Sequence, residues 1–430
     1  MTSPGASTAL LTDHYELTML SSALADGSGS RNCVFEVFAR GLPDGRRYGV
    51  VAGTERVLDG IANFRFTEAE LSHLAATAVV DEQTLSWLAD YEFAGDIDGY
   101  PEGELYFPGS PVLTVRGTFA EAVVLETLVL SILNHDTAVA SAAARMTCAA
   151  RGRPIIEMGG RRTHEYAAVA AARAAYLAGF ATTSNLEAGR RYGLSTRGTV
   201  AHAFLLLHDT EEAAFRTQVA KMGSDTTLLV DTYDITRGIE AAVRVAGPEL
   251  GAVRIDSGDV GALARQARDQ LDSLGARDAR IVVSGDLDEH SIAALRAEPV
   301  DAYGVGTSVV TGSGAPTANM VYKLVEVDGR PVAKRSPHKE SRGGRKTALR
   351  RFKKTGTAIE ELIYPIAGPE PERDTHDEIL PIPLVRAGEV VDNLPTLEDG
   401  RQRLRRALVS LPWEGLKLSH GEPAIPTLFP

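Results

Sequence analysis

The sequence predicts an α/β protein whose central part is a parallel sheet, most simply a barrel, between an α+β N-terminal region and a β-rich C-terminal region. Four short apolar segments of this central part end in small or acidic residues: "TLLVDTYD", "AVRIDSGD", "ARIVVSGD" and "DAYGVGTS". Helical segments such as "GALARQARDQLDSLGA" and "DEHSIAALRAE" separate them. An apolar strand that passes through polar residues into a helix is a β/α unit, and several units in tandem predict a parallel sheet.

The remaining elements follow in chain order. Residues 1–115 mix strand-like segments such as "NCVFEVFAR" with helical ones such as "TEAELSHLAATAV", which predicts an α+β domain. From Ala120 two alanine-rich helices are expected, in "AEAVVLETLVLSILNHDTAVASAAARMTCAARG" and "EYAAVAAARAAYLAGF". We therefore place the barrel domain at 116–325. Residues 326–430 return to strand-like segments and end in a proline-rich tail with one helix, "LEDGRQRLRRALVSL".

Composition limits the classes of partner. The 430 residues are 44% hydrophobic and 24% charged, which is ordinary for a globular enzyme, and the net charge is −12. This charge argues against general binding of nucleic acid or anionic membrane. The basic segment Lys334–Lys354 is expected to form a solvated or phosphate-facing loop and hairpin, since only Phe352 within it offers a ring for base stacking.

The cysteines and the N-terminus suggest a compartment. Cys33 and Cys148 are too few for a disulfide scaffold and lack the spacing of a zinc site, so we expect a reducing, cytoplasmic setting. No Lys or Arg precedes Arg31, so the positive region of a signal peptide is missing. The longest apolar run contains Glu126, and we expect no stretch of membrane-spanning length.

The ends of the β/α strands carry the candidate chemistry, because in a barrel these ends converge on one mouth. Glycine and serine turns let backbone amides approach an anion, and carboxylates bind hydroxyls. Such residues are also typical of tight turns and helix caps, and only their joint placement favours a site for a phosphorylated sugar. The candidates are Asp231, Arg254, Asp256, Ser257, Gly258, Asp259, Gly285, Asp286, Gly306 and Thr307.

Several other classes find little support. "GGRKT" is no P-loop because Arg345 precedes Lys346, "GVGTS" lacks the third glycine of a dinucleotide fingerprint, and there is no HExxH. A barrel lyase needs a Schiff-base lysine, but none lies between Lys221 and Lys323. A non-catalytic phosphosugar-binding barrel remains an alternative.

Six segments taken together closely resemble one family. In order, over most of the chain, they are "LTDHYELTM", "MGGRRTHE", "GTVAHA", "VDTYDI", "RIDSGD" and "GVGTS", and they resemble the nicotinate phosphoribosyltransferases. The resemblance implies the type II phosphoribosyltransferase fold: an irregular α/β barrel beside an N-terminal domain that the C-terminal segment completes, working as a homodimer. It also implies that nicotinate and 5-phosphoribosyl-1-pyrophosphate give nicotinate mononucleotide and pyrophosphate, a step of NAD biosynthesis coupled to ATP with Mg²⁺. Nicotinamide or quinolinate as the base is the alternative.

The resemblance also implies roles for individual residues. His202 matches the histidine that becomes phosphorylated, and Asp231 matches the acid that orients it. From the residues alone, a lone histidine at this place is more often a capped or buried histidine at a helix start. Arg161 matches the arginine at the base and pyrophosphate, and Tyr15 the tyrosine that stacks on the base from the neighbouring subunit. The metal ligands are not identified.

Two departures concern the choice of base. Met158 stands where related nicotinamide enzymes carry a stacking Phe, and Ser184 where they carry an Asp that accepts from the amide. A carboxylate would repel nicotinate, so a hydroxyl together with Arg161 favours the acid. By the same resemblance, Asp256 and Asp259 would hold the ribose hydroxyls, Arg254 the pyrophosphate, and Gly285, Gly306 and Thr307 the 5-phosphate.

Overall fold

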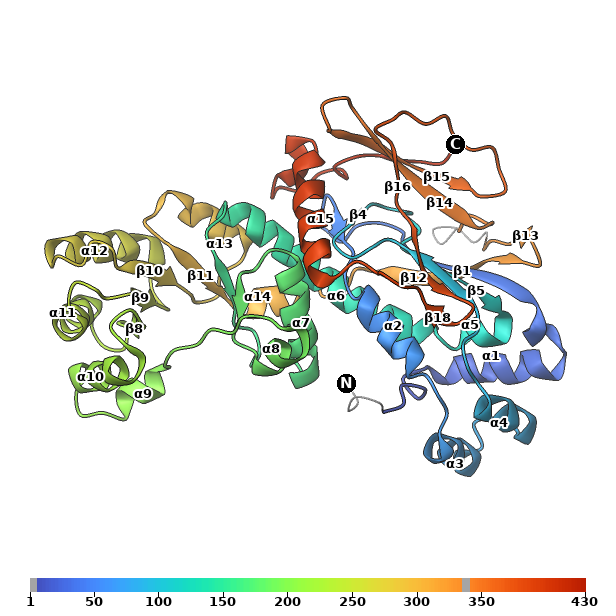
Figure 1. Ribbon diagram of the computed structural model, residues 1–430, viewed down its shortest axis with the longest axis horizontal. Coiled ribbons are helices and arrows are strands. Elements are labelled where there is room, and N and C mark those ends of the chain that lie inside the picture. The colour runs from blue at the N-terminus through green and yellow to red at the C-terminus, as the bar shows by residue number, and fades with distance from the viewer. Residues whose placement is uncertain (1–5, 335–340) are drawn as a thin grey trace. The chain divides into compact units, whose positions relative to one another are not determined.

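A computed structural model describes residues 6–334 and 341–430, and the chain divides into two compact units (Figure 1). The first unit combines 1–141 with 315–430, and the second is 142–314. The predicted domain boundaries, 115/116 and 325/326, differ from these divisions. The first division falls inside helix α6 (Glu126–Ala150), and a continuous helix carries no glycine or proline signal that would mark it in the sequence.

The first unit is built on an antiparallel sheet that joins both ends of the chain. Its order is β13-β12-β1-β5-β3-β17-β18, so strands from after residue 315 lie on both sides of the N-terminal strands. The strands are β13 (Arg330–Pro331), β12 (Met320–Val327), β1 (Asn32–Ala39), β5 (Leu113–Thr118), β3 (Asp96–Gly99), β17 (Ile382–Arg386) and β18 (Glu389–Val390). Phe35 of β1 stacks on Tyr322 of β12, with ring centroids 4.9 Å apart, in the core beneath the sheet.

Two smaller sheets and several helices complete the first unit. The four-stranded sheet has the order β16 (Glu378–Ile379), β14 (Lys346–Phe352), β15 (Ala358–Pro365) and β19 (Thr427–Leu428), and β2 (Gly49–Val50) pairs with β4 (Leu105–Tyr106). The helices are α1 (His14–Ala25), α2 (Thr54–Ala62), α3 (Glu68–Thr77), α4 (Glu82–Ala89), α5 (Phe119–Val123), the first part of α6, and α15 (Leu397–Ser410). Short 3₁₀ turns span Ser28–Ser30 and Trp413–Leu416.

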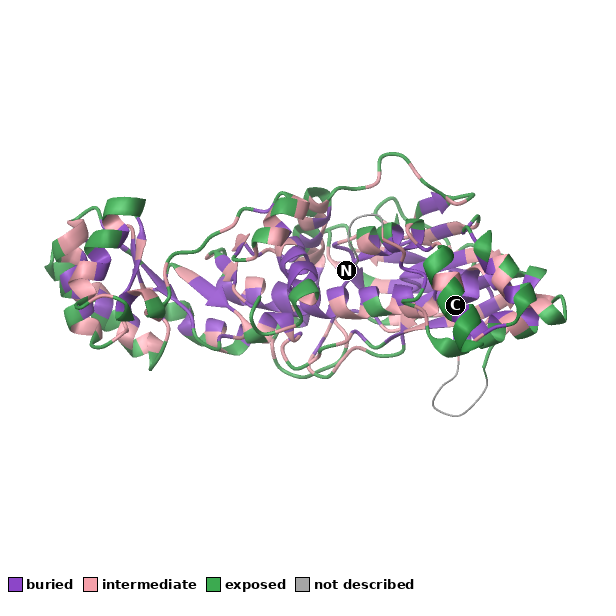
Figure 2. Ribbon diagram, turned by 90° about the horizontal axis from the view of Figure 1, so that it is seen from below, coloured by how far each residue is buried: buried purple, intermediate pink, exposed green. Residues whose placement is uncertain are grey.

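The second unit contains the predicted parallel sheet. Its order is β7 (Thr182–Thr183), β6 (Ile155–Glu157), β11 (Ala302–Val305), β10 (Arg280–Val283), β9 (Ala252–Ile255) and β8 (Thr227–Leu229). Its helices are α7 (Glu165–Leu177), α8 (Leu186–Tyr192), α9 (His202–Leu206), α10 (Glu211–Met222), α11 (Ile235–Ala246), α12 (Val260–Ser273), α13 (Glu289–Ala294) and α14 (Thr307–Val310), with a 3₁₀ turn at Leu295–Ala297. In Figure 2 the strands are buried and the outer faces of these helices are exposed.

The predicted α/β fold class is confirmed. The four apolar segments of the central region form β8, β9, β10 and β11, and each leads into a helix, as the β/α reading required. Sequence reasoning did not find β6 and β7, because strands of two or three residues are too short to show a period.

The basic segment is less solvated than predicted. Its hairpin forms as β14 and β15, but Lys346 and Arg350 are only 7% and 2% exposed. Lys346 pairs with Glu36 at 2.7 Å, and Arg350 pairs with Glu104 and Glu361. Buried cations require such partners, and these carboxylates come from distant parts of the sequence. Residues 335–340 of the segment lie outside the described residues.

Helices α5 and α6 follow each other over Phe119–Ala150 and together are long and apolar enough to cross a membrane. The sequence predicts no stretch of that length, because Glu126 interrupts the apolar run, but in the structure Glu126 is the first residue of α6. Within the most apolar window, 67% of the residues are buried in the protein. The core helix of a globular protein has the same length and composition.

Candidate active site

The carboxyl ends of the six parallel strands bring most of the predicted residues to one edge of the second unit's sheet. Arg161 follows β6, Ser184 follows β7, Asp231 follows β8, and Asp256 follows β9. A further segment extends the sheet beyond β7, since Thr196 pairs with Thr183 as parallel strands do. The chain then runs to His202, which contacts the opposite edge strand through Asp231. The stretch from Thr196 to His202 therefore connects the two edges of the sheet.

His202 is the first residue of α9 and lies beside a buried carboxylate. Its Nε2 is 3.1 Å from Asp231 Oδ1; the histidine side chain is 41% exposed, and the aspartate side chain 1%. The second oxygen, Asp231 Oδ2, accepts from the Asp256 amide at 2.8 Å and from the Ser257 hydroxyl at 3.0 Å. The carboxylate is thus held from the next strand and in turn fixes the imidazole, whose Nδ1 is left available.

Arg254, Asp256 and Ser284 form a second cluster, at the carboxyl ends of β9 and β10. Arg254 Nε donates to the Ser284 hydroxyl at 2.9 Å and its Nη2 donates to Asp256 Oδ1 at 2.7 Å, while the Ser284 hydroxyl donates to the same Oδ1. Burial raises the pKa of Asp256, but the hydrogen bond from Ser284 and the Arg254 guanidinium outweigh it, and the net pKa is below its ordinary value. Asp256 is therefore an ionised acceptor at neutral pH.

The turn after β10 depends on a glycine. Gly285 has φ +99°, and a Cβ there would lie 2.1 Å from the Asp256 carbonyl oxygen, so no other residue fits without moving β9. Asp286 follows with φ +48° and is exposed. Gly285 thus lets the ends of β9 and β10 approach each other, beside Asp256.

Other predicted residues form turns or helix starts. Asp259 caps α12 by accepting from the Ala262 amide at 3.1 Å, and Gly258 has φ +87° in the turn before it. Gly306 precedes the four-residue helix α14, whose first residue, Thr307, is exposed.

Glu157 is a candidate that sequence reasoning missed. It is 1% exposed, and one carboxyl oxygen accepts from the Gly159 amide while the other accepts from the Thr183 hydroxyl at 2.5 Å. Its carbonyl accepts from the Ser184 amide at 2.8 Å. Burial raises its pKa despite these hydrogen bonds. Glu157 therefore ties the loop that carries Arg161 to the strand that carries Ser184.

The same loop contains Gly159 and Met158, which pack against α14 and β11. A Cβ on Gly159 would lie 2.2 Å from Val310 Cγ1, so the loop packs closely on α14. Arg161 and Ser184 themselves are exposed. Met158 is half-buried: its amide donates to the Val305 carbonyl at 2.7 Å and its sulfur lies against Gly304. The thioether lies beside β11, and the structure does not assign it a role.

Glu211 is a second residue that the sequence did not reveal. It is the first residue of α10, and its Oε1 is buried without a hydrogen-bond partner among the described residues. Burial, followed by repulsion from Asp231 and Asp234, raises the pKa of Glu211 to about 7. A third carboxyl group thus lies near the carboxylate that holds His202.

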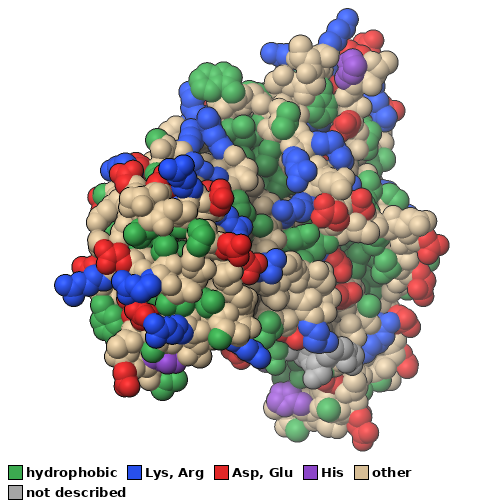
Figure 3. All heavy atoms as spheres, turned by 60° about the vertical axis from the view of Figure 1, so that its left-hand side comes forward, with side chains coloured by type: hydrophobic (Ala, Val, Ile, Leu, Met, Phe, Trp, Pro, Cys, Tyr) green, Lys and Arg blue, Asp and Glu red, His purple; other side chains and the backbone are tan. Residues whose placement is uncertain are grey.

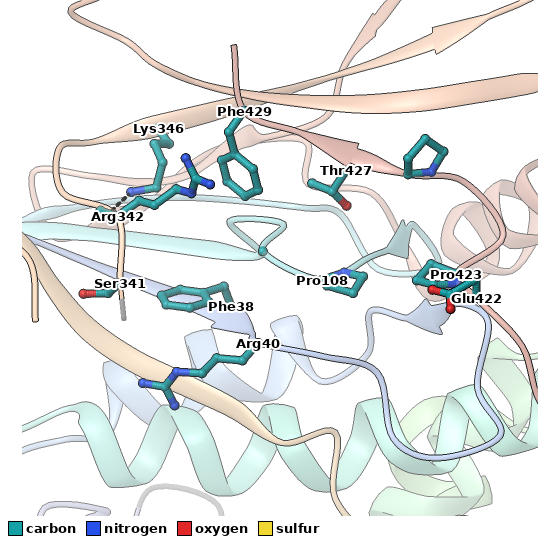
Figure 4. A pocket seen from close by; sticks show the side chains of 12 residues that line it. Phe38, Arg40, Pro108, Ser341, Arg342, Lys346, Glu422, Pro423, Thr427 and Phe429 are labelled. Carbon is teal, nitrogen blue, oxygen red and sulfur yellow. Dashed lines mark hydrogen bonds between the residues drawn. The ribbon is translucent and has the colours of Figure 1, made fainter. Parts of the chain in front are cut away.

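Tyr15 belongs to the first unit. It lies in the first turn of α1, is 45% exposed, and its pKa is raised to about 12 by burial and by the neighbouring Glu126 carboxylate. The same unit contains a cavity of about 870 Å³ that no predicted site residue lines (Figure 4). Arg342 stacks over Phe429 there, 4.0 Å from the ring centroid, and Phe38 and Arg40 lie below Arg342 in the view.

No group of three His, Cys, Asp or Glu side chains is arranged to hold a metal ion in the part of the chain that the structure describes. Surface charges of both signs are interspersed over the face shown in Figure 3. What the strand ends offer is a partly exposed histidine oriented by a buried carboxylate, an ionised Asp256, glycine turns and several exposed arginines. Such a set suits a ligand with hydroxyl groups and anionic groups.

Comparison with known proteins agrees with this fold and identifies the family. Residues 10–134 match the nicotinate phosphoribosyltransferase (NAPRTase) N-terminal domain, and residues 139–314 match the quinolinate phosphoribosyl transferase C-terminal domain. The crystal structure of human nicotinic acid phosphoribosyltransferase superposes with a TM-score of 0.84 at 24% identity, covering 97% of each chain. That of nicotinate-nucleotide pyrophosphorylase from Pyrococcus furiosus has a TM-score of 0.78 at 25% identity and covers 93% of this chain and 94% of the other. The fold is therefore that of the type II phosphoribosyltransferases.

Sequence relatives are more specific. The nicotinate phosphoribosyltransferase pncB1 of Mycobacterium tuberculosis is 65% identical over 426 residues, which are 97% of this chain and 94% of the relative. The nicotinate phosphoribosyltransferase of Bacillus subtilis is 38% identical over 80% of this chain and 73% of its own length. The chain belongs to the nicotinate phosphoribosyltransferase family, and the resemblance seen in the six segments is confirmed.

Proposed function

We propose that the chain is an ATP-coupled nicotinate phosphoribosyltransferase of NAD biosynthesis, which converts nicotinate and 5-phosphoribosyl-1-pyrophosphate to nicotinate mononucleotide and pyrophosphate. Identity of 65% over nearly the whole length of a relative with this name supports the reaction. The observation that carries the ATP-coupled part is the contact between His202 and the buried Asp231.

In the transfer, the pyridine nitrogen forms a bond to C1 of the ribose while the bond from C1 to the pyrophosphate oxygen breaks, and its electron pair leaves with pyrophosphate. No side chain needs to move a proton, so catalysis rests on alignment and on charge neutralisation. Arg161 is available to the leaving group, and the ionised Asp256 to the ribose hydroxyls. The turns at Gly285 and Gly306, with Thr307, would take the 5-phosphate.

ATP coupling would use the free nitrogen of His202. The Nε2–H group donates a hydrogen bond to Asp231, which leaves the lone pair on Nδ1. This lone pair attacks the γ-phosphorus, the bond to ADP breaks, and a phosphohistidine forms. Water later releases inorganic phosphate from it. Mg²⁺ would arrive with the phosphorylated substrates and neutralise their charge; one carboxylate such as Asp256 with phosphate oxygens is enough to hold it. Dependence on Mg²⁺ and a cytoplasmic location stay predictions.

The direct test is an assay of the purified chain with nicotinate, nicotinamide or quinolinate, each with the sugar pyrophosphate and ATP. We expect pyrophosphate release with nicotinate, and transfer of the label from γ-labelled ATP to the protein. Absence of pyrophosphate release with every base would refute the proposal and favour a phosphosugar-binding protein. Pyrophosphate release without labelling of the protein would support the transferase activity but refute the phosphohistidine intermediate.

We also propose that the chain works as a homodimer and that Tyr15 stacks on the base in the site of the partner. Its exposed ring in the first turn of α1 supports this role. Mixing Tyr15→Ala with His202→Ala chains should restore ATP-coupled activity, because one site of the mixed dimer has both residues intact. No recovery after confirmed subunit exchange would contradict a shared site.

A further inference from the structure

Three neighbouring strand ends of the second unit present polar side chains next to each other. Thr183 donates its amide to the Ser195 carbonyl at 3.2 Å, and its carbonyl accepts from the Arg197 amide at 2.9 Å. This is the pattern of a parallel bridge, in which Thr196 is the partner of Thr183. Arg197 is therefore the in-register neighbour of Ser184, one residue beyond the bridge on each strand.

The register also sets the direction of the side chains. Successive side chains alternate between the two faces of a sheet, and in-register neighbours share a face. Thr183 directs its hydroxyl to the buried Glu157, so Ser184 and Arg197 lie together on the opposite side of their strands, where both are exposed. The Ser184 amide in turn bonds the Glu157 carbonyl at the start of the loop that leads to Arg161. Ser184 thus follows a strand that lies between β6, which leads to Arg161, and the segment at Thr196, which leads to Arg197.

These arginines are not neutralised by the protein. Within the described residues, Arg161 and Arg197 form no ion pair, whereas Arg190 and Arg191 of the adjoining helix α8 both pair with Glu187. The Glu157 carboxyl group at this edge is buried and accepts from the Gly159 amide and the Thr183 hydroxyl. An anionic ligand would therefore supply the missing charge.

We infer that Arg197 is a specificity-determining residue that binds the carboxylate of nicotinate, together with the Ser184 hydroxyl, opposite Arg161. The inference rests on the proposed function. A guanidinium has only donors, so it suits both oxygens of a carboxylate, whereas the NH₂ group of a carboxamide would face it donor to donor. Arg197 thus disfavours nicotinamide through its own contact, in addition to the effect of having no acidic residue at position 184.

The test compares Arg197→Ala with Arg197→Lys and with Arg190→Ala in the full chain. Arg190→Ala removes the same charge from the neighbouring helix and serves as the matched control. For Arg197→Ala we expect KM for nicotinate to rise on the order of ten- to a hundredfold, as for loss of a charged hydrogen-bonded contact. KM for the sugar pyrophosphate should change by less than about twofold, and Arg197→Lys, which keeps the charge but not the fork, should be intermediate.

Competitive inhibitors give a second readout that does not require turnover of the amide. Inhibition by benzoate should weaken in Arg197→Ala as nicotinate binding does, and inhibition by benzamide should not. Equal weakening of both inhibitors, an equal rise in KM for the sugar pyrophosphate, or no change in any of them would overturn the inference. Inactivity of the unaltered chain with nicotinate would instead refute the proposed function, so the two failures are distinguishable.

Discussion

The two halves of the sheet edge in the second unit carry opposite charges. After β6 and β7 the exposed groups are the guanidiniums of Arg161 and Arg197, whereas after β8 and β9 the polar groups are the carboxylates of Asp231 and Asp256 with Glu211 nearby. In both halves, however, a buried carboxylate accepts a hydrogen bond from the neighbouring strand or its end: Glu157 from the Thr183 hydroxyl in the first half, and Asp231 from the Asp256 amide in the second. The halves differ in the groups that face a ligand. The first half offers guanidinium cations to an anionic ligand, and the second offers an imidazole and carboxylate acceptors.

The largest effect is expected from removal of the imidazole in the acidic half. His202→Ala should abolish substrate-dependent ATP hydrolysis and protein labelling, because no nucleophile remains for ATP. Slow nicotinate mononucleotide synthesis without ATP should persist at high sugar pyrophosphate, since the histidine takes no part in bond formation at C1. Asp231→Asn should act in the same direction but more weakly. Retained labelling in His202→Ala would make His202 a structural histidine.

A smaller effect is expected from a negative charge in the cationic half. Ser184→Asp puts a carboxylate between the two arginines, where it would repel nicotinate and accept from the amide of nicotinamide. We expect kcat/KM for nicotinate to fall on the order of a hundredfold and that for nicotinamide to rise. Ser184→Ala, which adds no charge, is the control. An unchanged ratio of the two kcat/KM values would show that position 184 does not face the base.

The smallest effect concerns Glu211 and depends on pH. Its pKa is raised to about 7 in the folded chain, so between pH 4.5 and 7 the unfolded chain loses this proton first and stability falls as pH rises. Glu211→Gln removes this loss, so it should stabilise the protein at pH 8 relative to pH 5. The gain should be on the order of 1 kcal/mol, because solvent screens a half-buried group. Urea unfolding at both pH values measures it, and equal gains would mean that the carboxyl group does not titrate there.

Sequence reasoning succeeded where a pattern extends over many residues. The apolar segments that became β8 to β11 each end in polar residues and lead into a helix, and this repeated pattern indicated a parallel sheet with a mouth. Asp231 and Asp256 could therefore be expected near each other, and the resemblance added His202. The division of the chain inside α6 had no such signal.

The residues that sequence reasoning missed belong to no motif along the chain. Glu157 and Thr183 lie on strands of three and two residues, Ser284 lies inside the common text "VVSGD", and Glu211 is one of two glutamates at the start of α10. Nothing in their neighbours along the chain distinguishes them from caps or surface polar residues. Their importance comes from burial beside residues that are distant in the sequence: Thr183 and Glu157 are 26 residues apart, and Ser284 and Asp256 are 28 apart.

By itself, the sequence determined the α/β class, the family and the identity of the groups at the strand ends, because apolar periodicity and short motifs are local properties of a chain. The tertiary structure decided which of these groups are held and which are free. The register of β6, β7 and the segment at Thr196 directs Glu157 inward and places Arg197 beside Ser184. This register depends on hydrogen bonds between strands that are distant in the sequence and on the space that Gly159 leaves for α14. Neither can be deduced from the order of the residues along the chain.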